Sequence, residues 1–148
     1  GLYSRKAYDV WERDKQHPDK AAVVMLVMNN LTKCNERYGH EAGDTYLKKA
    51  SEMITNAFSQ ENTAYRIGGD EFCVIMPDAK ENSIEGAMDR LKELQKQYKG
   101  TDHSVEVEIA CGYAFYDDNV DQSFVDTRKR ADTHMYENKR MLKGKEPR

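Results

Sequence analysis

The sequence predicts a single α+β domain in which helices flank a mixed, mainly antiparallel central sheet. Two observations lead to this prediction. Stretches with helical periodicity alternate along the 148 residues with short apolar runs that are partly β-branched. Two of these runs are separated by Gly68-Gly69, and strands joined by a two-residue turn must be antiparallel. No linker, repeat or low-complexity tract interrupts the chain, so we predict one domain over residues 1–148.

The first third of the chain is expected to form a helix, a strand and a second helix. The first helix covers 2–16, where an apolar stripe runs until His17-Pro18-Asp19 ends it. The continuous apolar run over 21–28 is short and bounded by asparagines, which favours a strand buried on both faces. A short helix over 32–37 and a turn at 38–40 follow.

The remaining elements continue the alternation, with apolar residues at helical spacing in the helices and alternating apolar residues in the last strand. Polar residues at the starts of two helices are suited to capping them. The expected elements are a helix over 44–58, hairpin strands over 64–67 and 72–76, a helix capped by Asn82, a strand over 105–116, and a helix over 123–142 capped by Ser123.

The composition is that of an ordinary soluble protein, with 39% hydrophobic and 33% charged residues. The net charge of −3 argues against a grip on a nucleic acid polymer, although it leaves room for a local basic pocket for one nucleotide. The three cysteines, Cys34, Cys73 and Cys111, have no metal-binding spacing, and we expect buried, reduced thiols as in a cytoplasmic protein. No apolar run approaches the length of a membrane span, so we expect no membrane contact by this segment.

The most informative run is Arg66-Ile67-Gly68-Gly69-Asp70-Glu71-Phe72. A glycine pair between strand-like segments predicts a tight turn with positive φ, which glycine adopts without a Cβ clash. Such a turn holds Asp70 and Glu71 at an exposed tip. Neighbouring acids on a strand point to opposite faces, so one of them is free to hold a divalent cation. The alternative is that Asp70 is a solvated turn residue.

Four ordered motifs extend this signal over nearly the whole chain. They are Gly1-Leu2-Tyr3-Ser4-Arg5, the run from Asn35 to His40 with Gly43-Asp44, the run from Arg66 to Phe72, and Ala131-Asp132 with Met135-Tyr136 and Lys139. Together they resemble the GGDEF family, the diguanylate cyclase domains. The resemblance implies a fold similar to the adenylate cyclase catalytic domain and the polymerase palm.

The resemblance also implies an activity and its partners. Family members join two GTP molecules into cyclic di-GMP and release pyrophosphate. Two facing domains each hold one GTP, and each ribose 3′-hydroxyl attacks the opposite α-phosphate, assisted by Mg²⁺ or Mn²⁺. We expect the homodimer only in a full-length parent, because upstream parts often impose the pairing, and we expect this chain alone to be a monomer. Because the chain starts at Gly1 without methionine, we expect a longer signalling protein with an upstream sensor or membrane anchor.

The resemblance assigns roles around the acidic motif. Asp70 falls on the family's metal-binding acid, and Glu71 on the acid that shapes the same site. Gly68 and Gly69 allow close approach of the backbone to phosphate, or merely form the turn. The family also uses a backbone carbonyl as a metal ligand, and Met28 supplies the corresponding carbonyl here.

Further roles concern the nucleotide. Asn35 and Asp44 match the guanine readers, and a carboxylate suits the donor edge of guanine. Asp44 also has a plain structural interpretation as an acid in the first turn of a helix. The remaining matches are Asn30 and Leu31, whose backbone N–H groups meet phosphate, Lys139, which binds phosphate, and Lys143, which stands where the family has arginine. The alternative for the two lysines is purely structural: positive side chains near the C-terminal end of a helix interact favourably with its dipole.

Two departures from the family pattern concern the chemistry. The first metal-binding aspartate of the family is replaced by Val27, whose side chain cannot ligate a cation. A charge contact of this kind amounts to roughly 4 kcal/mol at the dielectric of a protein surface. The inhibitory product site is also absent, because Ser59 and Asn62 stand where the family has the arginine and aspartate of that site.

Three functional hypotheses follow. The first is a degenerate domain that keeps part of the GTP pocket, binds Mg²⁺ or Mn²⁺ weakly, makes little or no cyclic di-GMP, and acts as a nucleotide-binding or regulatory module. The second is an active diguanylate cyclase with a rearranged metal site. The third is a structural dimerisation domain that binds no nucleotide. GTP is the main expected ligand, and cyclic di-GMP is a further candidate.

Overall fold

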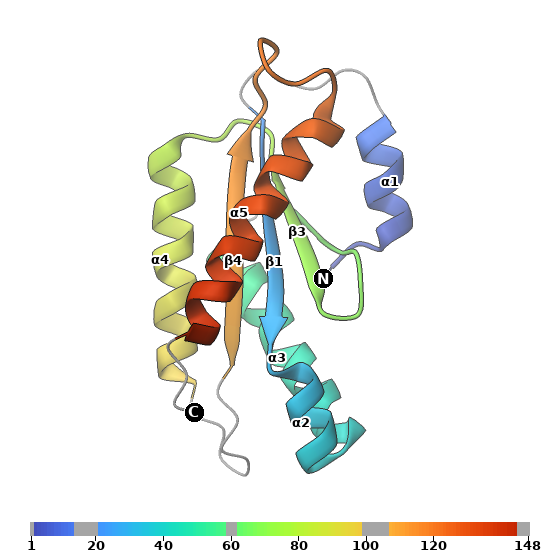
Figure 1. Ribbon diagram of the computed structural model, residues 1–148, viewed down its shortest axis with the longest axis vertical. Helices are drawn as coiled ribbons and strands as arrows, with labels where there is room; N and C mark the ends of the chain where they lie inside the picture. Colours follow the sequence, from blue (N-terminus) through green and yellow to red (C-terminus); the bar gives the residue numbers. More distant parts are fainter. Residues whose placement is uncertain (1, 14–20, 59–61, 99–106, 145–148) are drawn as a thin grey trace.

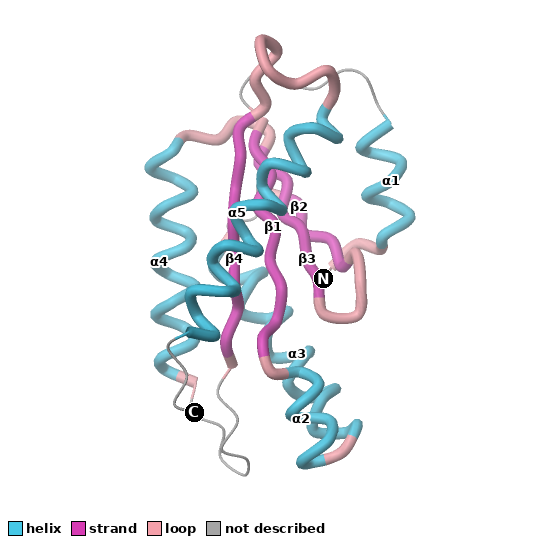
Figure 2. The backbone as a smooth tube through the Cα atoms, viewed as in Figure 1, coloured by secondary structure: helices cyan, strands magenta, loops and turns pink. Residues whose placement is uncertain are grey.

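The computed structural model describes residues 2–13, 21–58, 62–98 and 107–144. Four antiparallel strands form one sheet in the order β2-β3-β1-β4 (Figures 1 and 2). The strands are β1 (Ala22–Asn29), β2 (Thr63–Arg66), β3 (Glu71–Met76) and β4 (Glu108–Phe115). The fold class is α+β, as the sequence predicts.

The described residues also form five helices. They are α1 (Arg5–Arg13), α2 (Leu31–Tyr38), α3 (His40–Ala57), α4 (Glu81–Gln97) and α5 (Phe124–Gly144). In Figure 1, α5 crosses in front of β1 and β4. None of the described helices combines the length and the apolar character that crossing a bilayer requires.

The strand β1 occupies the centre of the sheet and pairs with β3 on one side and β4 on the other. All eight of its residues are buried, which confirms the prediction of a strand covered on both faces. Its side chains alternate between two cores. Val24 and Leu26 pack in the core formed with α3 and α4, and Val23 and Met25 pack in the core formed with α1 and α5.

The N-terminal helix is shorter than predicted. Instead of starting the helix at residue 2, the segment before Arg5 lies along the edge of the sheet, where Tyr3 makes a parallel bridge to Tyr65. The Tyr3 N–H donates to the carbonyl of Ala64, and the Tyr3 carbonyl accepts from the N–H of Arg66. The backbone groups of Tyr3 are thus paired with the sheet edge, whereas in a first helical turn the N–H group would have no partner inside the helix. The predicted end of this helix at 14–16 lies outside the described residues.

Other boundaries also differ. The third helix begins at His40, four residues before the predicted start, so Asp44 is not in its first turn, and Glu41 is the acid there. Asn82 does not cap α4, because the Lys80 carbonyl already accepts from Ser83 and Ile84 and the helix begins at Glu81. The prediction for α5 is confirmed at its start.

Ser123 precedes the first residue of α5, and its hydroxyl accepts a hydrogen bond from the N–H of Val125 at 3.3 Å. The cysteines also agree with expectation. Cys34, Cys73 and Cys111 are all buried and free, and burial raises the pKa of the Cys111 thiol to about 11. They behave as small apolar core residues.

The hairpin between β2 and β3 is antiparallel, as predicted, but its turn is different. Arg66 pairs with Phe72, and the N–H groups of Ile67 and Gly68 both donate to the Glu71 carbonyl. Neither glycine of the pair has positive φ. The connection is longer than two residues, and a single carbonyl closes it, so no left-handed residue is required.

Candidate functional site

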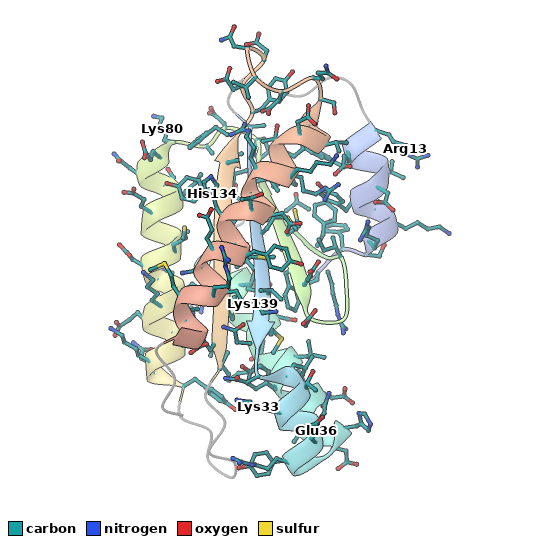
Figure 3. All side chains as sticks on the ribbon, in the orientation of Figure 1. Arg13, Lys33, Glu36, Lys80, His134 and Lys139 are labelled. Carbon is teal, nitrogen blue, oxygen red and sulfur yellow. The ribbon has the colours of Figure 1, made fainter. Side chains whose placement is uncertain are left out.

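A cleft of about 370 Å³ opens where β1 ends. Four separate segments form it: the end of β1, the first turn of α2, the hairpin loop and the middle of α5. Its lining residues are Met28, Asn29, Asn30, Leu31, Thr32, Lys33, Asp70 and Lys139. Five of these, Met28, Asn30, Leu31, Asp70 and Lys139, are residues to which the sequence assigns nucleotide or metal binding. Figure 3 shows Lys139 on α5 in front of β1, with Lys33 below it on α2.

The chain turns sharply at the floor of the cleft. Asn30 has φ of 69°, a left-handed conformation that asparagine tolerates better than most residues. It ends β1 and caps α2, where its carbonyl accepts from the N–H of Cys34. The N–H groups of the first helical turn therefore begin in the cleft without partners inside the helix. Donors of this kind favour anions such as phosphate.

The hairpin loop forms another wall. The Asp70 carbonyl accepts from the Met28 N–H at 2.9 Å, so the backbone of the loop is fixed to the end of β1. Asp70 brings a negative group to this cleft, and Lys139 and Lys33 bring two positive ones. Gly68, Gly69 and Glu71 do not line it. A Cβ on Gly69 would meet nothing within 4 Å, so packing does not require glycine there.

Glu71 lies beside the cleft among other carboxylates. It pairs across the sheet with Val27 and is half-buried. Burial raises the pKa of the Glu71 carboxyl, and the charges of Asp132 and Asp70 raise it further, while Lys139 opposes them. Burial likewise raises the pKa of Asp132. The hairpin and α5 therefore crowd negative charge next to the cleft.

Val27 lies within an apolar cluster against α1 and α5 and is only 2% exposed. It stands opposite Glu71 on β3 and Ala110 on β4. Asp70 is the one carboxylate that lines the cleft, and no group of three His, Cys, Asp or Glu side chains among the described residues is placed to hold a metal ion. The donor set therefore does not fit a divalent cation held by the protein alone.

The two predicted guanine readers are brought together by the packing of α2 on α3. A Cβ on Gly43 would lie 1.6 Å from Oδ1 of Asn35, so the Asn35 amide rests directly on the backbone of Gly43. Asp44 is the next residue and is exposed. Asn35 lies one helical turn beyond the residues of α2 that line the cleft. The Asn35 amide thus contacts the residue that precedes Asp44, one helical turn from the part of α2 that lines the cleft.

Three predicted positions contribute less. Lys143 is on α5, one turn after Lys139, but its side chain is outside the described part of the chain. Asn62 is half-buried just before β2, and Ser59 lies outside the described residues. The absence of the product site stays a prediction.

Sequence reasoning missed a group of polar residues under the cleft. Asn29 is 1% exposed, and its amide donates to the Glu108 carboxylate at 2.8 Å. The hydroxyl of Tyr46 donates to the Asn29 carbonyl at 2.7 Å. These residues come from β1, β4 and α3, and the spacing of Tyr46 marks it only as part of a buried helix face. The one available signal was a polar residue, Asn29, at the end of an apolar strand.

Comparison with known proteins gives a consistent result. Residues 3–145 match the family described as "Diguanylate cyclase, GGDEF domain". Diguanylate cyclase DgcS of Shewanella oneidensis is 34% identical over 74 residues, which are 50% of this chain and 25% of DgcS. Cyclic di-GMP phosphodiesterase PdeR of Escherichia coli K12 is 31% identical over 140 residues, which are 92% of this chain and 21% of PdeR. The chain thus spans about a quarter or less of these two relatives.

Among solved structures, the crystal structure of the GGDEF domain of YfiN, also called TpbB, from Pseudomonas aeruginosa is similar to this chain with a TM-score of 0.81. The two sequences are 26% identical, and the match covers 95% of this chain and 92% of that one. The family match includes every residue that lines the cleft.

Proposed function

Because the chain belongs to the GGDEF family of diguanylate cyclase domains, we propose that it binds GTP as a regulatory module of a cyclic di-GMP signalling protein and makes little or no cyclic di-GMP. The observation that carries this proposal is the buried hydrocarbon of Val27 beside a cleft with one lining carboxylate. Binding needs the complementary groups around GTP. Synthesis also needs the charge of the triphosphate and of the attacking oxygen to be neutralised.

Each retained residue has a role in binding. The N–H groups at Asn30 and Leu31 donate to phosphate oxygens at the start of α2, and Lys139 adds a positive charge to the same cleft. Asn35 and Asp44 read the guanine edge, since the carboxylate accepts from the guanine N1–H and N2–H₂. Gly68 and Gly69 do not line this cleft, so we give them the role of forming the loop that carries Asp70.

Mg²⁺ or Mn²⁺, which the family uses, would neutralise phosphate charge. Asp70 and the Met28 carbonyl are the ligands that this chain retains for it, and the missing carboxylate at Val27 weakens that binding. GTP binding by this chain is therefore expected to depend little on the metal. We place the domain in the cytoplasm and propose that a sensor domain precedes it in the parent protein. Homodimers form only in that full-length parent.

The test is calorimetric titration of GTP with and without magnesium. We expect weak binding that changes little with the metal. Lys139→Ala should weaken it about 10- to 100-fold, the usual contribution of a hydrogen bond to a charged group. Lys80→Ala is the matched control, because Lys80 lies at the start of α4, away from Lys139 and Lys33 (Figure 3). The absence of GTP binding would favour a purely structural domain, and turnover like that of an intact family member would reject impaired synthesis.

The second candidate is an active cyclase with a rearranged metal site. The crowding of Asp70, Glu71 and Asp132, each with a carboxylate near the cleft, favours it. Here the full-length protein should synthesise cyclic di-GMP at a rate that Asp70→Ala abolishes and that Val27→Asp does not raise. A rise with Val27→Asp would instead indicate that the missing carboxylate limits the native protein.

A further inference from the structure

The hydroxyl of Tyr46 stands between the backbones of β1 and β4, at the end of β1 that lines the cleft. Asn29 and Glu108 are directly paired in the register of β1 and β4. The Glu108 N–H donates to the Tyr46 hydroxyl at 3.0 Å, and that hydroxyl donates to the Asn29 carbonyl at 2.7 Å. Tyr46 is 4% exposed, and burial raises its pKa to about 12. The hydroxyl keeps its proton at neutral pH and acts as donor and acceptor at once.

The same strand end is held from the other face of the sheet. Alternation along β1 puts Asn29 on the face of Val27, which packs toward α5. There the Asn29 amide donates to the Glu108 carboxylate at 2.8 Å. Asn29 lines the cleft, and the left-handed Asn30 follows it directly. The position of the first turn of α2 therefore depends on the hydrogen bonds that fix Asn29 to Glu108 and Tyr46.

Tyr46 also belongs to the element that carries the guanine end of the site. It lies on α3 two residues after Asp44, and Gly43 on the same helix supports the Asn35 amide. One side chain thus connects the helix of Asp44 to the floor of the cleft that holds Asp70 and Lys139. We propose that Tyr46 is a positioning residue, which fixes the guanine-reading helix relative to the phosphate cleft. This inference rests on the proposed GTP binding.

A fixed distance between the phosphate cleft and the guanine-reading residues affects only a ligand that contacts both. GTP contacts the phosphate cleft and the base readers together, so its affinity gains from having the two held in place beforehand. Inorganic triphosphate occupies only the cleft and has no such gain. Loss of the Tyr46 hydroxyl should therefore weaken GTP selectively, whereas a general loosening of the fold would weaken both ligands alike.

The experiment compares GTP with inorganic triphosphate by calorimetry, at a temperature where each variant is shown by circular dichroism to be folded. Tyr46→Phe should raise the Kd for GTP about 3- to 12-fold, equivalent to losing a hydrogen bond of ordinary strength. The Kd for triphosphate should stay within about twofold. Tyr113→Phe, which removes a hydroxyl on β4, is the control and should change neither. If Tyr46→Phe is not folded at that temperature, both titrations are repeated at a lower temperature at which circular dichroism shows it folded, so that the loss of the Tyr46 hydroxyl is still what is tested.

The outcomes separate the inference from the function on which it rests. A wild-type chain that prefers GTP to triphosphate supports guanine reading, whatever the variants do. Equal weakening of both ligands by Tyr46→Phe, or no change in either, would then overturn the positioning role alone. A wild-type chain without that preference overturns the guanine site, and the role of Tyr46 is overturned with it.

Discussion

Val27 lies in an apolar cluster, yet its partner on β3 is an acidic residue. It pairs with Glu71 across the sheet and is buried against α5. The charges of Asp132 and Asp70 raise the pKa of the Glu71 carboxyl. In this chain the valine methyl groups fill the space, so the carboxylates nearby are not joined by another buried charge. The residue therefore stabilises the fold through apolar packing.

The substitution Val27→Asp tests whether a carboxylate at this position lowers stability and binds a metal ion. Without a divalent cation, the new buried carboxylate beside Glu71 should lower the free energy of unfolding by on the order of 3 kcal/mol. Magnesium or manganese should restore part of that loss, because a cation binds the folded site and not the unfolded chain. Urea denaturation in EDTA and in excess magnesium measures both values.

Val27→Asn is the control for this prediction, since it adds a polar group of the same size without the charge. It should be destabilised in either buffer with little response to the metal. An equal response of the Asp and Asn variants to magnesium would show that the added carboxylate does not bind the ion.

Single residues of the site differ in how far the sequence reveals them. Asp70 and Lys139 stand in motifs, so their meeting in one cleft was predictable from the chain alone. Tyr46 and Glu108 are 62 positions apart and their contact depends on the packing of α3 below the sheet. No local pattern encodes such a contact. Asp44 was assigned correctly to a helix but wrongly to its first turn, because α3 begins at His40.

At the scale of the elements, α5 packs closely on β4. A Cβ on Gly112 would lie 2.2 Å from the backbone nitrogen of Met135 and 2.7 Å from the Ala131 carbonyl oxygen. Glycine is needed here because the backbone of a helix lies directly on the backbone of a strand. This contact sets the height of α5 above the sheet, and with it the place of Lys139.

Gly112→Ala should therefore lower the free energy of unfolding by about 1–3 kcal/mol or more, the usual cost of overpacking, and weaken triphosphate binding as α5 shifts. Gly86→Ala is the matched control. Gly86 lies within α4, and a Cβ there would meet nothing within 4 Å. Alanine should stabilise that helix by roughly 0.5–1 kcal/mol. Thermal denaturation of the two variants tests the pair, and equal effects would contradict the close approach.

The order and kind of the elements followed from periodicity, but their ends did not. The start of α1 was misplaced because Tyr3 bonds to the edge of β2, and a contact across the sheet is invisible in local sequence. The hairpin was predicted, yet its glycines do not have positive φ, because two N–H groups share the Glu71 carbonyl. In each case a hydrogen bond to a distant or shared partner overrode the local preference.

At the scale of the whole molecule, the response of stability to acid depends on a network in the connection between β4 and α5. Burial alone would raise the pKa of Asp121. Hydrogen bonds from Arg130, from the Asp117 N–H and from Thr127 outweigh burial and hold the pKa of Asp121 below its ordinary value. A carboxyl whose pKa is lower in the folded state stabilises the fold above its unfolded pKa and loses that effect as the pH falls through its folded pKa.

Asp121→Asn should thus cost about 1.5–3 kcal/mol at pH 7, the usual contribution of hydrogen bonds to a charged group. The difference from wild type should shrink as the pH falls below about 4, where free aspartate begins to be protonated. Urea denaturation across pH 2–7, taken as a difference between the two proteins, cancels the opposite contributions of Glu71 and Asp132. A difference that is constant with pH would contradict the assignment.

The central place of β1 has a consequence during synthesis of the chain. Its partners come much later in the sequence, and the last pairing, of Ala22 with Phe115, waits until β4 has been made. Until then a nascent chain carries the uncharged apolar run of residues 22–28 without a sheet to bury it. Folding of the sheet is therefore completed only after most of the domain has left the ribosome, and chaperones that shield apolar segments have their clearest target in that strand.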